Sequence, residues 1–399
     1  MPYDAEKPFR YFSSSAILGQ HPASPGSGGS SMKFTCDKSG FAREISFAQE
    51  IIASRNALSI MSNVYLEVSG SSLTLRATDV KVAFETTIPV SDAISGSVTV
   101  FCDKLSGILA SLPDGEITVE QTEGRVTLKP SNKKVRFQLK TISGEKFPEL
   151  PRAPEESYFE VPARELRKMV TQTMFAVSTD ETRYFMNGVF MEKAPDGGVI
   201  MVATDGRRLS FAKKEFEGNI PDFRGVIVPP KALGILVKRS GDEGMVSMAV
   251  TDRNVFFRFG SYSISSVLIE GQFPNYQKVI PQNQRQSFTV LKSDLSDALR
   301  RVSIFVEQKS NRTFFGLSDG TLTLSSEESE IGTAREELPC RYEGEDLTIA
   351  LNYKYVEEPL KAMDSESVTV EFSEAARAIT IKPEPAQDYF HVVMPMQLD

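Results

Sequence analysis

The sequence predicts an α+β fold, a chain of three similar tandem domains with two helices each, packed on antiparallel sheets. The first observation is a unit in which a helix, a Gly/Asp turn and two alternating strands follow one another over residues 228–260. The same order of elements recurs over 101–130 and 351–383, offset by 128 and 122 residues. Periods of roughly 20–50 residues indicate solenoids, so this much longer period indicates three copies of a whole domain.

The repeated unit has local signals for each of its elements. Pro229 and Pro230 suit a helix N-terminus, where the missing N–H group costs nothing. Leu233, Leu236 and Val237 then recur at helical spacing and predict one buried helix face. The alternating segments after the turn predict a strand pair.

The remainder of each copy is also similar. A strand followed by a helix opens the copies at 32–52, 158–177 and 287–306. Strand pairs follow, and the segments LTLRATD and VIMVATD end at Asp79 and Asp205, which are 126 residues apart. We therefore expect about eight short strands in each domain.

Composition changes mark the expected domain boundaries. Residues 1–31 contain the run HPASPGSGGSS and predict a flexible N-terminal extension. Stretches rich in Pro or in Gln and Asn near 155 and 283 separate the copies. The expected domains are therefore 32–155, 156–282 and 283–399.

The overall composition limits the cellular setting. No apolar run approaches the ~20 residues of a membrane span, and no secretory signal opens the chain. The three cysteines Cys36, Cys102 and Cys340 are far apart and follow no metal-binding spacing. We expect a cytoplasmic protein with no membrane partner.

Positive charge gathers on two predicted helices although the chain is acidic. Segments 162–178 and 230–240 carry a net charge of +5 in a chain of −8, which leaves −13 for the remainder. Basic helix faces of this kind suit a polyanion, bound without sequence specificity. Arg164, Arg167, Lys168 and Lys238 are the candidate contacts. Ordinary solvation of surface helices explains the same charges, and the mixed charge of helix 293–309 favours that alternative.

No catalytic or metal-binding motif is present. The chain has two histidines, His21 and His391, and lacks the spacing of the hydrolase, phosphate-loop and zinc motifs. Asp205, in Thr204-Asp205-Gly206, is better interpreted as a turn residue that accepts local backbone N–H bonds. We expect no enzyme and no cofactor. The alternatives are a repeat-built enzyme or carbohydrate-type β protein, and a monomeric interaction scaffold without DNA.

Several motifs, in order and at preserved spacing, resemble a known family. They are MKFTCD at 32–37, TRYFMNGVF at 182–190, ATDGRRLS at 203–210, GQFPNY at 271–276 and the ending VVMPMQL. From Met32 to Leu398 the chain resembles the bacterial DNA polymerase III beta subunits, the sliding clamps. Three repeats are typical of bacterial clamps, whereas the clamps of eukaryotes and archaea have two.

The resemblance implies a non-enzymatic processivity factor for DNA replication. It implies a head-to-tail homodimer that forms a ring, encircles double-stranded DNA and slides without sequence specificity. It also implies a hydrophobic peptide-binding pocket that tethers other proteins. The implied partners are the clamp loader, the catalytic subunit of DNA polymerase III, repair polymerases, ligase and mismatch-repair proteins.

The resemblance also assigns site residues. Arg55, Tyr184 and Phe185 match positions near the DNA path, and Lys231 begins an inward-facing helix; for the two aromatic residues a place in the core is an equal alternative. The partner-peptide pocket is assigned to eleven residues, although the ending VVMPM also fits an ordinary buried strand: Thr204, Gly206, Arg207, Leu209, Pro274, Val279, Tyr355, Val392, Met394, Pro395 and Met396.

Two residues depart from the family pattern. Arg207 stands where many members have His, and Lys278 replaces a frequent Arg, so both bear on partner preference. Asp399 adds a terminal carboxylate near the pocket.

The resemblance also implies a seam between two copies of the chain. It pairs Lys133, Lys134, Arg136 and Phe137 with Ile304, Phe305, Glu327, Glu328 and Glu330. We expect the apolar contacts to dominate there, since exposed ion pairs contribute little.

Overall fold

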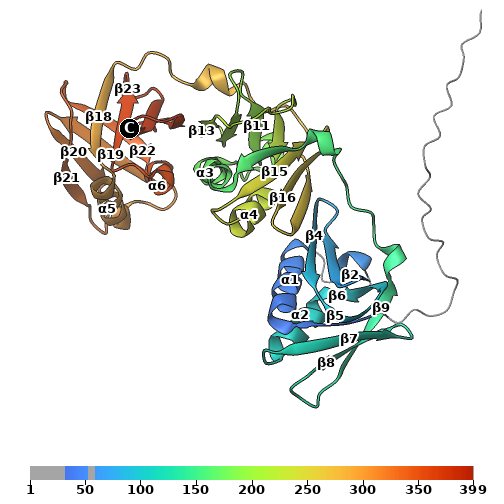
Figure 1. Ribbon diagram of the computed structural model, residues 1–399. Coiled ribbons are helices and arrows are strands. Elements are labelled where there is room, and N and C mark those ends of the chain that lie inside the picture. Colours follow the sequence, from blue (N-terminus) through green and yellow to red (C-terminus); the bar gives the residue numbers. More distant parts are fainter. Residues whose placement is uncertain (1–31, 53–58, 399) are drawn as a thin grey trace, which may run out of the picture.

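The computed structural model describes residues 32–52 and 59–398. Within these residues three domains follow one another along an arc (Figure 1). The predicted N-terminal extension, Arg55 and Asp399 lie outside the described residues. The first domain contains β1 (Lys33–Asp37), α1 (Lys38–Ile51), β2 (Asn63–Ser69), β3 (Ser72–Thr78), β4 (Val82–Pro89), β5 (Ser91–Ile94), β6 (Gly96–Phe101), α2 (Cys102–Ser111), β7 (Glu116–Thr122), β8 (Arg125–Pro130) and β9 (Phe137–Ser143).

The second and third domains repeat this order of elements except for β5, which has no counterpart in either. The second contains β10 (Phe159–Pro162), α3 (Ala163–Thr173), β11 (Val189–Lys193), β12 (Val199–Thr204), β13 (Arg208–Lys214), β14 (Val226–Val228), α4 (Pro230–Arg239), β15 (Met245–Val250), β16 (Asn254–Phe259) and β17 (Tyr262–Val267). The third contains β18 (Gln286–Leu291), α5 (Lys292–Val302), β19 (Arg312–Ser318), β20 (Thr321–Ser326), β21 (Arg335–Pro339), β22 (Leu347–Asn352), α6 (Tyr353–Ala362), β23 (Ser367–Phe372), β24 (Ile379–Glu384) and β25 (Tyr389–Val393).

The sheets are antiparallel throughout and continue across the domain junctions. β17 of the second domain pairs with β4 of the first, from Ser263 opposite Glu85 to Ser266 opposite Val82. β25 of the third domain pairs with β13 of the second, from Arg208 opposite Val393 to Ala212 opposite Tyr389. Each junction is therefore a ladder of backbone hydrogen bonds, which fixes register and resists rotation between domains.

The helices of the described residues lie on the concave side of the arc, and the sheets form its convex side (Figure 1). Each helix buries one apolar face. In α4, Ala232, Leu233, Ile235 and Leu236 are buried, and Pro230 occupies the first turn as the sequence predicts. The α+β fold with antiparallel sheets and two helices in each domain is confirmed.

One predicted helix is shorter than expected. The basic segment 162–178 forms α3 only to Thr173, and a 3-10 turn follows at Met174–Ala176. Thr173 has φ −121° and ψ −40°, and its Oγ1 donates a hydrogen bond to the Met169 carbonyl at 2.8 Å. Local bonding of a threonine hydroxyl to the preceding turn competes with regular helix geometry, which explains the early end.

Candidate functional site

A tight turn between β12 and β13 supports the candidate pocket. The Asp205 carboxylate accepts the backbone N–H groups of Arg207 at 2.9 Å and of Arg208 at 3.1 Å. Gly206 has φ +87°, a conformation that side chains other than glycine rarely adopt. The Thr204 hydroxyl closes the turn by donating to the Arg208 carbonyl at 2.6 Å. The predicted turn role of Asp205 is confirmed.

Arg208 joins the second and third domains at this turn. It is only 9% exposed. Its guanidinium donates to Asp205 at 3.0 Å, to the Phe175 carbonyl at 2.6 Å and to Glu358 of α6. It also lies over the Tyr355 ring, 4.5 Å from the centroid. Arg208 therefore positions both the turn and the aromatic residue of the pocket, a role that the sequence analysis missed.

Substitution of Arg208 by Ala is expected to destabilise the fold. It leaves the Asp205 and Glu358 carboxylates, 17% and 36% exposed, without their guanidinium partner. Loss of one member of a largely buried ion pair costs about 3 kcal/mol. The chain has no Trp, so urea unfolding followed by circular dichroism is the measurement. Arg207→Ala, at the exposed neighbour, should change the free energy of unfolding by less than about 0.5 kcal/mol; equal losses would refute the junction role.

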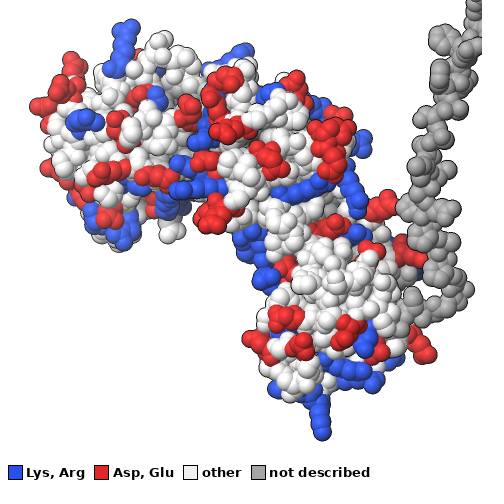
Figure 2. Space-filling view, in the orientation of Figure 1, with Lys and Arg blue, Asp and Glu red and all other residues white. Residues whose placement is uncertain are grey.

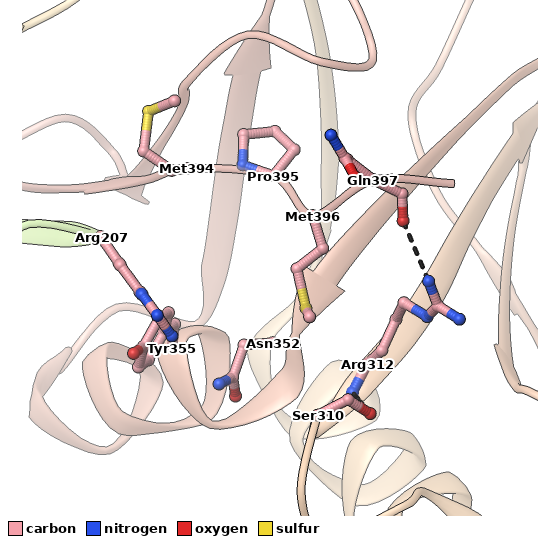
Figure 3. A pocket seen from close by; sticks show the side chains of 9 residues that line it. All are labelled: Arg207, Ser310, Arg312, Asn352, Tyr355, Met394, Pro395, Met396 and Gln397. Atoms are coloured by element: carbon pink, nitrogen blue, oxygen red, sulfur yellow. Dashed lines mark hydrogen bonds between the residues drawn. The ribbon is translucent and has the colours of Figure 1, made fainter. Parts of the chain in front are cut away.

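The end of the chain crosses from the second domain to the third above Tyr355. The Met394 backbone N–H donates to the Arg207 carbonyl at 2.9 Å, and the Met396 N–H donates to the Ala350 carbonyl at 2.8 Å. These two bonds attach the segment 394–397 to the turn between β12 and β13 at one end and to β22 at the other. A cavity of about 470 Å³ opens beneath it (Figure 3), lined by Arg207, Ser310, Arg312, Asn352, Tyr355, Met394, Pro395, Met396 and Gln397.

Five of the eleven residues assigned to the pocket line this cavity: Arg207, Tyr355, Met394, Pro395 and Met396. Leu209 and Val392 are buried in an adjacent apolar cluster with Phe273 and Tyr276. Thr204 is buried in the turn, Gly206 is exposed there, Pro274 is partly exposed, and Val279 is 57% exposed on a short 3-10 turn. Four further lining residues were not predicted from the sequence, of which Asn352 gives a signal as a helix-capping residue: Ser310, Arg312, Asn352 and Gln397.

His391 lies behind the pocket, fully buried between the domains. Neither ring nitrogen has a hydrogen-bond partner among the described residues. Burial, and secondly the charge of Arg208, lowers the pKa of His391 from 6.5 to about 3. The unfolded chain therefore binds more protons between pH 6.5 and 3, so stability should fall as pH decreases through this window.

His391→Phe is expected to make the protein less sensitive to acid. Between pH 7.5 and 5 the original chain should lose about 2 kcal/mol more free energy of unfolding than the variant, because only the original must keep an imidazole neutral. The measurement is urea unfolding at both pH values. The readout is the change in the free energy of unfolding between the two pH values. An effect of repacking that is the same at both pH values cancels in this difference. Identical pH responses would contradict the buried neutral state.

Two lysines predicted to face DNA lie on α4 and reach the first domain. The Lys231 ammonium donates to the Asp79 carboxylate at 2.5 Å and to the Ile51 carbonyl at 2.8 Å. The Lys238 ammonium lies 2.8 Å from both carboxylate oxygens of Glu50. Figure 2 shows Lys and Arg side chains along the concave edge, where Figure 1 places α4. Lys231 and Lys238 therefore tie the second domain to the first.

The basic residues of α3 differ from one another in their contacts. Arg164 is exposed. Arg167 donates to the Val237 carbonyl at 3.0 Å and forms an ion pair with Asp242. The Lys168 ammonium lies 2.8 Å from Asp364 of the third domain and lowers the pKa of that carboxyl group. Only Arg164 of the three thus keeps its charge free of an ion pair within the described residues.

The two aromatic residues assigned to the DNA path differ in exposure. Tyr184 is 53% exposed. Phe185 is partly buried and packs against the apolar cluster of Leu209 and Val392. Phe185 therefore belongs to the apolar cluster of Leu209 and Val392, whereas Tyr184 is exposed.

The residues assigned to the seam lie at opposite ends of the arc. Ile304 is 76% exposed and Phe305 is 40% exposed, in a 3-10 turn after α5. Their neighbours Glu328 and Glu330 are exposed, whereas Glu327 is held by Arg312 at 2.7 Å. At the other end, Lys133, Lys134 and Arg136 are exposed and Phe137, the first residue of β9, is partly exposed.

No three His, Cys, Asp or Glu side chains within 32–52 and 59–398 converge in a way that could hold a metal ion. In the same residues, no helix is long and apolar enough to cross a membrane.

Family models and relatives match the chain nearly end to end. The N-terminal, central and C-terminal domains of the DNA polymerase III beta subunit match residues 32–151, 160–275 and 277–397. The beta sliding clamp of Treponema pallidum is 49% identical over 372 residues, 92% of this chain and all of that protein. That of Pseudomonas aeruginosa is 29% identical over 371 residues, with the same coverage.

Solved structures agree in fold. A sliding clamp from Pseudomonas aeruginosa bound to griselimycin has a TM-score of 0.86 at 28% identity, and one from Bartonella birtlesii bound to griselimycin has 0.85 at 29%. Each comparison covers 92% of this chain and 100% of the other. The family resemblance of the sequence is confirmed. The chain therefore belongs to the beta sliding clamps, the non-catalytic beta subunits that act as processivity factors of DNA polymerase III.

Proposed function

We propose that two copies of this chain close head to tail into a ring that encircles duplex DNA and slides along it. Because the chain belongs to this family, its partners are DNA and the polymerase. The proposal adds the ring, the residues that build it and the pocket that tethers other proteins. It also keeps the domain boundaries at 32–155, 156–282 and 283–399.

The pattern of strand pairing carries this proposal. At both junctions within the chain, the last strand of one three-strand meander pairs with the last strand of a meander in the next domain: β4 with β17, and β13 with β25. The corresponding strands that remain are β21 in the third domain and β9 in the first. β21 pairs only with β20 among the described strands, and Phe137–Lys140 of β9 pair only with β8.

A third junction of the same kind would use both free edges. It cannot form within one chain, because β21 and β9 lie toward opposite ends of the arc (Figure 1). A second copy related by a two-fold axis supplies the missing strand at each end, and two equivalent seams close a ring. Open strand edges favour such pairing.

The side chains beside these edges are complementary. Lys133, Lys134 and Arg136 precede β9, and Glu328 and Glu330 precede β21. Exposed Ile304 and Phe305 supply the apolar part of the contact. We assign the specificity of the seam to the charges and most of its stability to apolar burial.

The inner surface suits a duplex that is enclosed but weakly held. Lys168, Lys231 and Lys238 each have a carboxylate partner from a neighbouring domain. Because phosphates must compete with those carboxylates, each contact adds little affinity, and the attraction remains independent of sequence. Arg164 and Tyr184 are the more accessible candidates for direct contact.

The cavity beneath 394–397 is the proposed tether for partner proteins. Its methionines and Tyr355 offer apolar surface of the kind that binds short linear motifs. The proposed partners are the clamp loader, the catalytic subunit of DNA polymerase III, repair polymerases, ligase and mismatch-repair proteins.

Sedimentation equilibrium at micromolar concentration tests the ring. The expected mass is twice the 44.2 kDa of one chain. A species of one chain mass at these concentrations would favour the monomeric scaffold and would refute the closed seam.

A further inference from the structure

A second cavity lies at the other end of the ladder that joins the second and third domains. The pairing of β13 with β25 begins beside the cavity beneath 394–397 and ends with Ala212 opposite Tyr389. One residue further, the backbone N–H of Lys213 donates to the Asp388 carbonyl at 2.8 Å. A cavity of about 390 Å³ opens there between the ends of these strands and α3, the helix at the edge of the second domain that faces the third (Figure 1). Small-molecule sites span about 300–1,000 Å³, so this volume suits a small ligand.

Two polar side chains that line this cavity are buried without a hydrogen-bond partner. Gln172 of α3 is 5% exposed, and its side-chain amide makes no hydrogen bond within the described residues. Tyr389 is 2% exposed, and its hydroxyl also lacks a partner there. The nearby Ser210 hydroxyl donates to the Gln172 carbonyl at 2.6 Å, so the lone pairs of the Tyr389 oxygen remain open. Because buried polar groups are nearly always satisfied, these two oxygens are available to a bound donor.

The charged groups around the cavity leave acceptors unpaired, not donors. Three lysines line it, and each has a carboxylate partner: Lys168 with Asp364, Lys213 with Asp196, and Lys214 with Glu165. Two further lining carboxylates, those of Glu215 and Asp388, are exposed and form no ion pair within the described residues. An anion would have to compete with the partners of the lysines, whereas a cation meets two free carboxylates.

We propose that this cavity binds an aliphatic ammonium group, either of a free diamine or of a lysine side chain from a bound protein. An ammonium has three donors and no acceptor. The carboxylates of Asp388 and Glu215 offset its charge. The side-chain oxygens of Gln172 and Tyr389 accept its N–H groups, and the alkyl chain packs on Met169 of α3. The site depends neither on the ring nor on the peptide tether.

Methyl NMR of the full-length protein tests the site. The chain has 13 methionines, which are isotope-labelled at their methyl groups, and single Met→Leu variants identify the signals of Met169, Met394 and Met396. The five-carbon diamine cadaverine, added at constant ionic strength, should shift the Met169 signal saturably with a dissociation constant of about 1–10 mM. Met394 and Met396, at the opposite end of the ladder, should keep their signals.

Two further probes define the chemistry of the ligand. Nα-acetyl-lysine methylamide carries one alkylammonium group and should shift the Met169 signal as cadaverine does. Tetramethylammonium has the same charge without an N–H group, so it should leave the signal in place.

Two variants identify the residues responsible. Asp388→Asn and Gln172→Leu should each raise the dissociation constant of cadaverine about fivefold, the effect of one partly exposed ion pair or one hydrogen bond to a charged group. Asp252→Asn changes the net charge equally, at an exposed carboxylate in the turn between β15 and β16, and should keep the affinity within about twofold. Unchanged Met394 and Met396 signals confirm that each variant keeps its fold at the junction.

The outcomes separate the proposal from its rivals. A Met169 signal that no amine shifts, or that inorganic phosphate shifts instead, would overturn the proposal. An equal response to tetramethylammonium, or an affinity unchanged in both Asp388→Asn and Gln172→Leu, would overturn it as well. Saturation by both amines supports a site open to a lysine side chain, and saturation by cadaverine alone supports a site for a free diamine.

Discussion

Replacing Ile304 and Phe305 together by Asp is expected to convert the dimer into a monomer. Both side chains are exposed in the single chain and become buried at the proposed seam. Each should contribute about 1.5 kcal/mol or more through apolar burial, and an unpaired carboxylate buried there adds a further cost. The dissociation constant of the dimer, measured by sedimentation velocity, should be at least about 100-fold higher than in the original protein.

The control for this experiment is an exposed apolar residue away from both ends of the arc. Met245 is 48% exposed in β15 of the second domain. Met245→Asp should leave the mass at that of a dimer. A dimer that withstands the Ile304 and Phe305 changes would place the contact between copies elsewhere.

Replacing Met394 and Met396 together by Ala should weaken peptide binding strongly while the dimer persists. Both residues line the cavity, and Figure 3 shows the Met396 side chain pointing from the chain end toward Asn352. Their truncation removes apolar contact of about 1 kcal/mol each, so affinity should fall about 30-fold. Fluorescence anisotropy with a Leu- and Phe-containing peptide is the measurement.

Met245→Ala provides the matched control, as a methionine of the same exposure as Met394 outside the pocket. It should bind the peptide with the affinity of the original chain. Unchanged affinity in the Met394 and Met396 variant would remove the pocket assignment while leaving the ring proposal standing.

The sequence predicted the fold because the signals that specify it are local. Helix starts at Pro230, apolar periodicity and turn residues recur in each copy, so the repeat identified three domains of one type. The turn at Asp205 was likewise predictable, since a short carboxylate accepts backbone N–H groups two and three residues ahead. The enzyme alternative is excluded by family membership.

Contacts between domains could not be predicted in this way. Arg208 binds Glu358, which is 150 residues away in the sequence, and Lys231 binds Asp79, which is 152 residues away. Nothing in the neighbouring sequence distinguishes the buried Arg208 from the exposed Arg207. The merging of sheets at β4 with β17 and at β13 with β25 was equally hidden, because each strand alone has the pattern of any edge or central strand.

The residues of the pocket could likewise be predicted only in part. The resemblance supplied the apolar residues of the chain end. Among the polar residues, Arg312 begins β19, Ser310 lies just before that strand, and Asn352 caps α6. These polar residues meet only after the third domain folds. Their arrangement around the cavity is therefore a property of the folded domain.

Encirclement is tested most directly by loading the protein on circular duplex DNA and then cutting the circle. If two copies enclose a duplex that they hold weakly, the protein stays on intact circles in salt that screens its surface contacts and leaves once the DNA has free ends. Gel filtration of labelled protein with the DNA follows both states. Retention that is the same before and after cutting would contradict the ring.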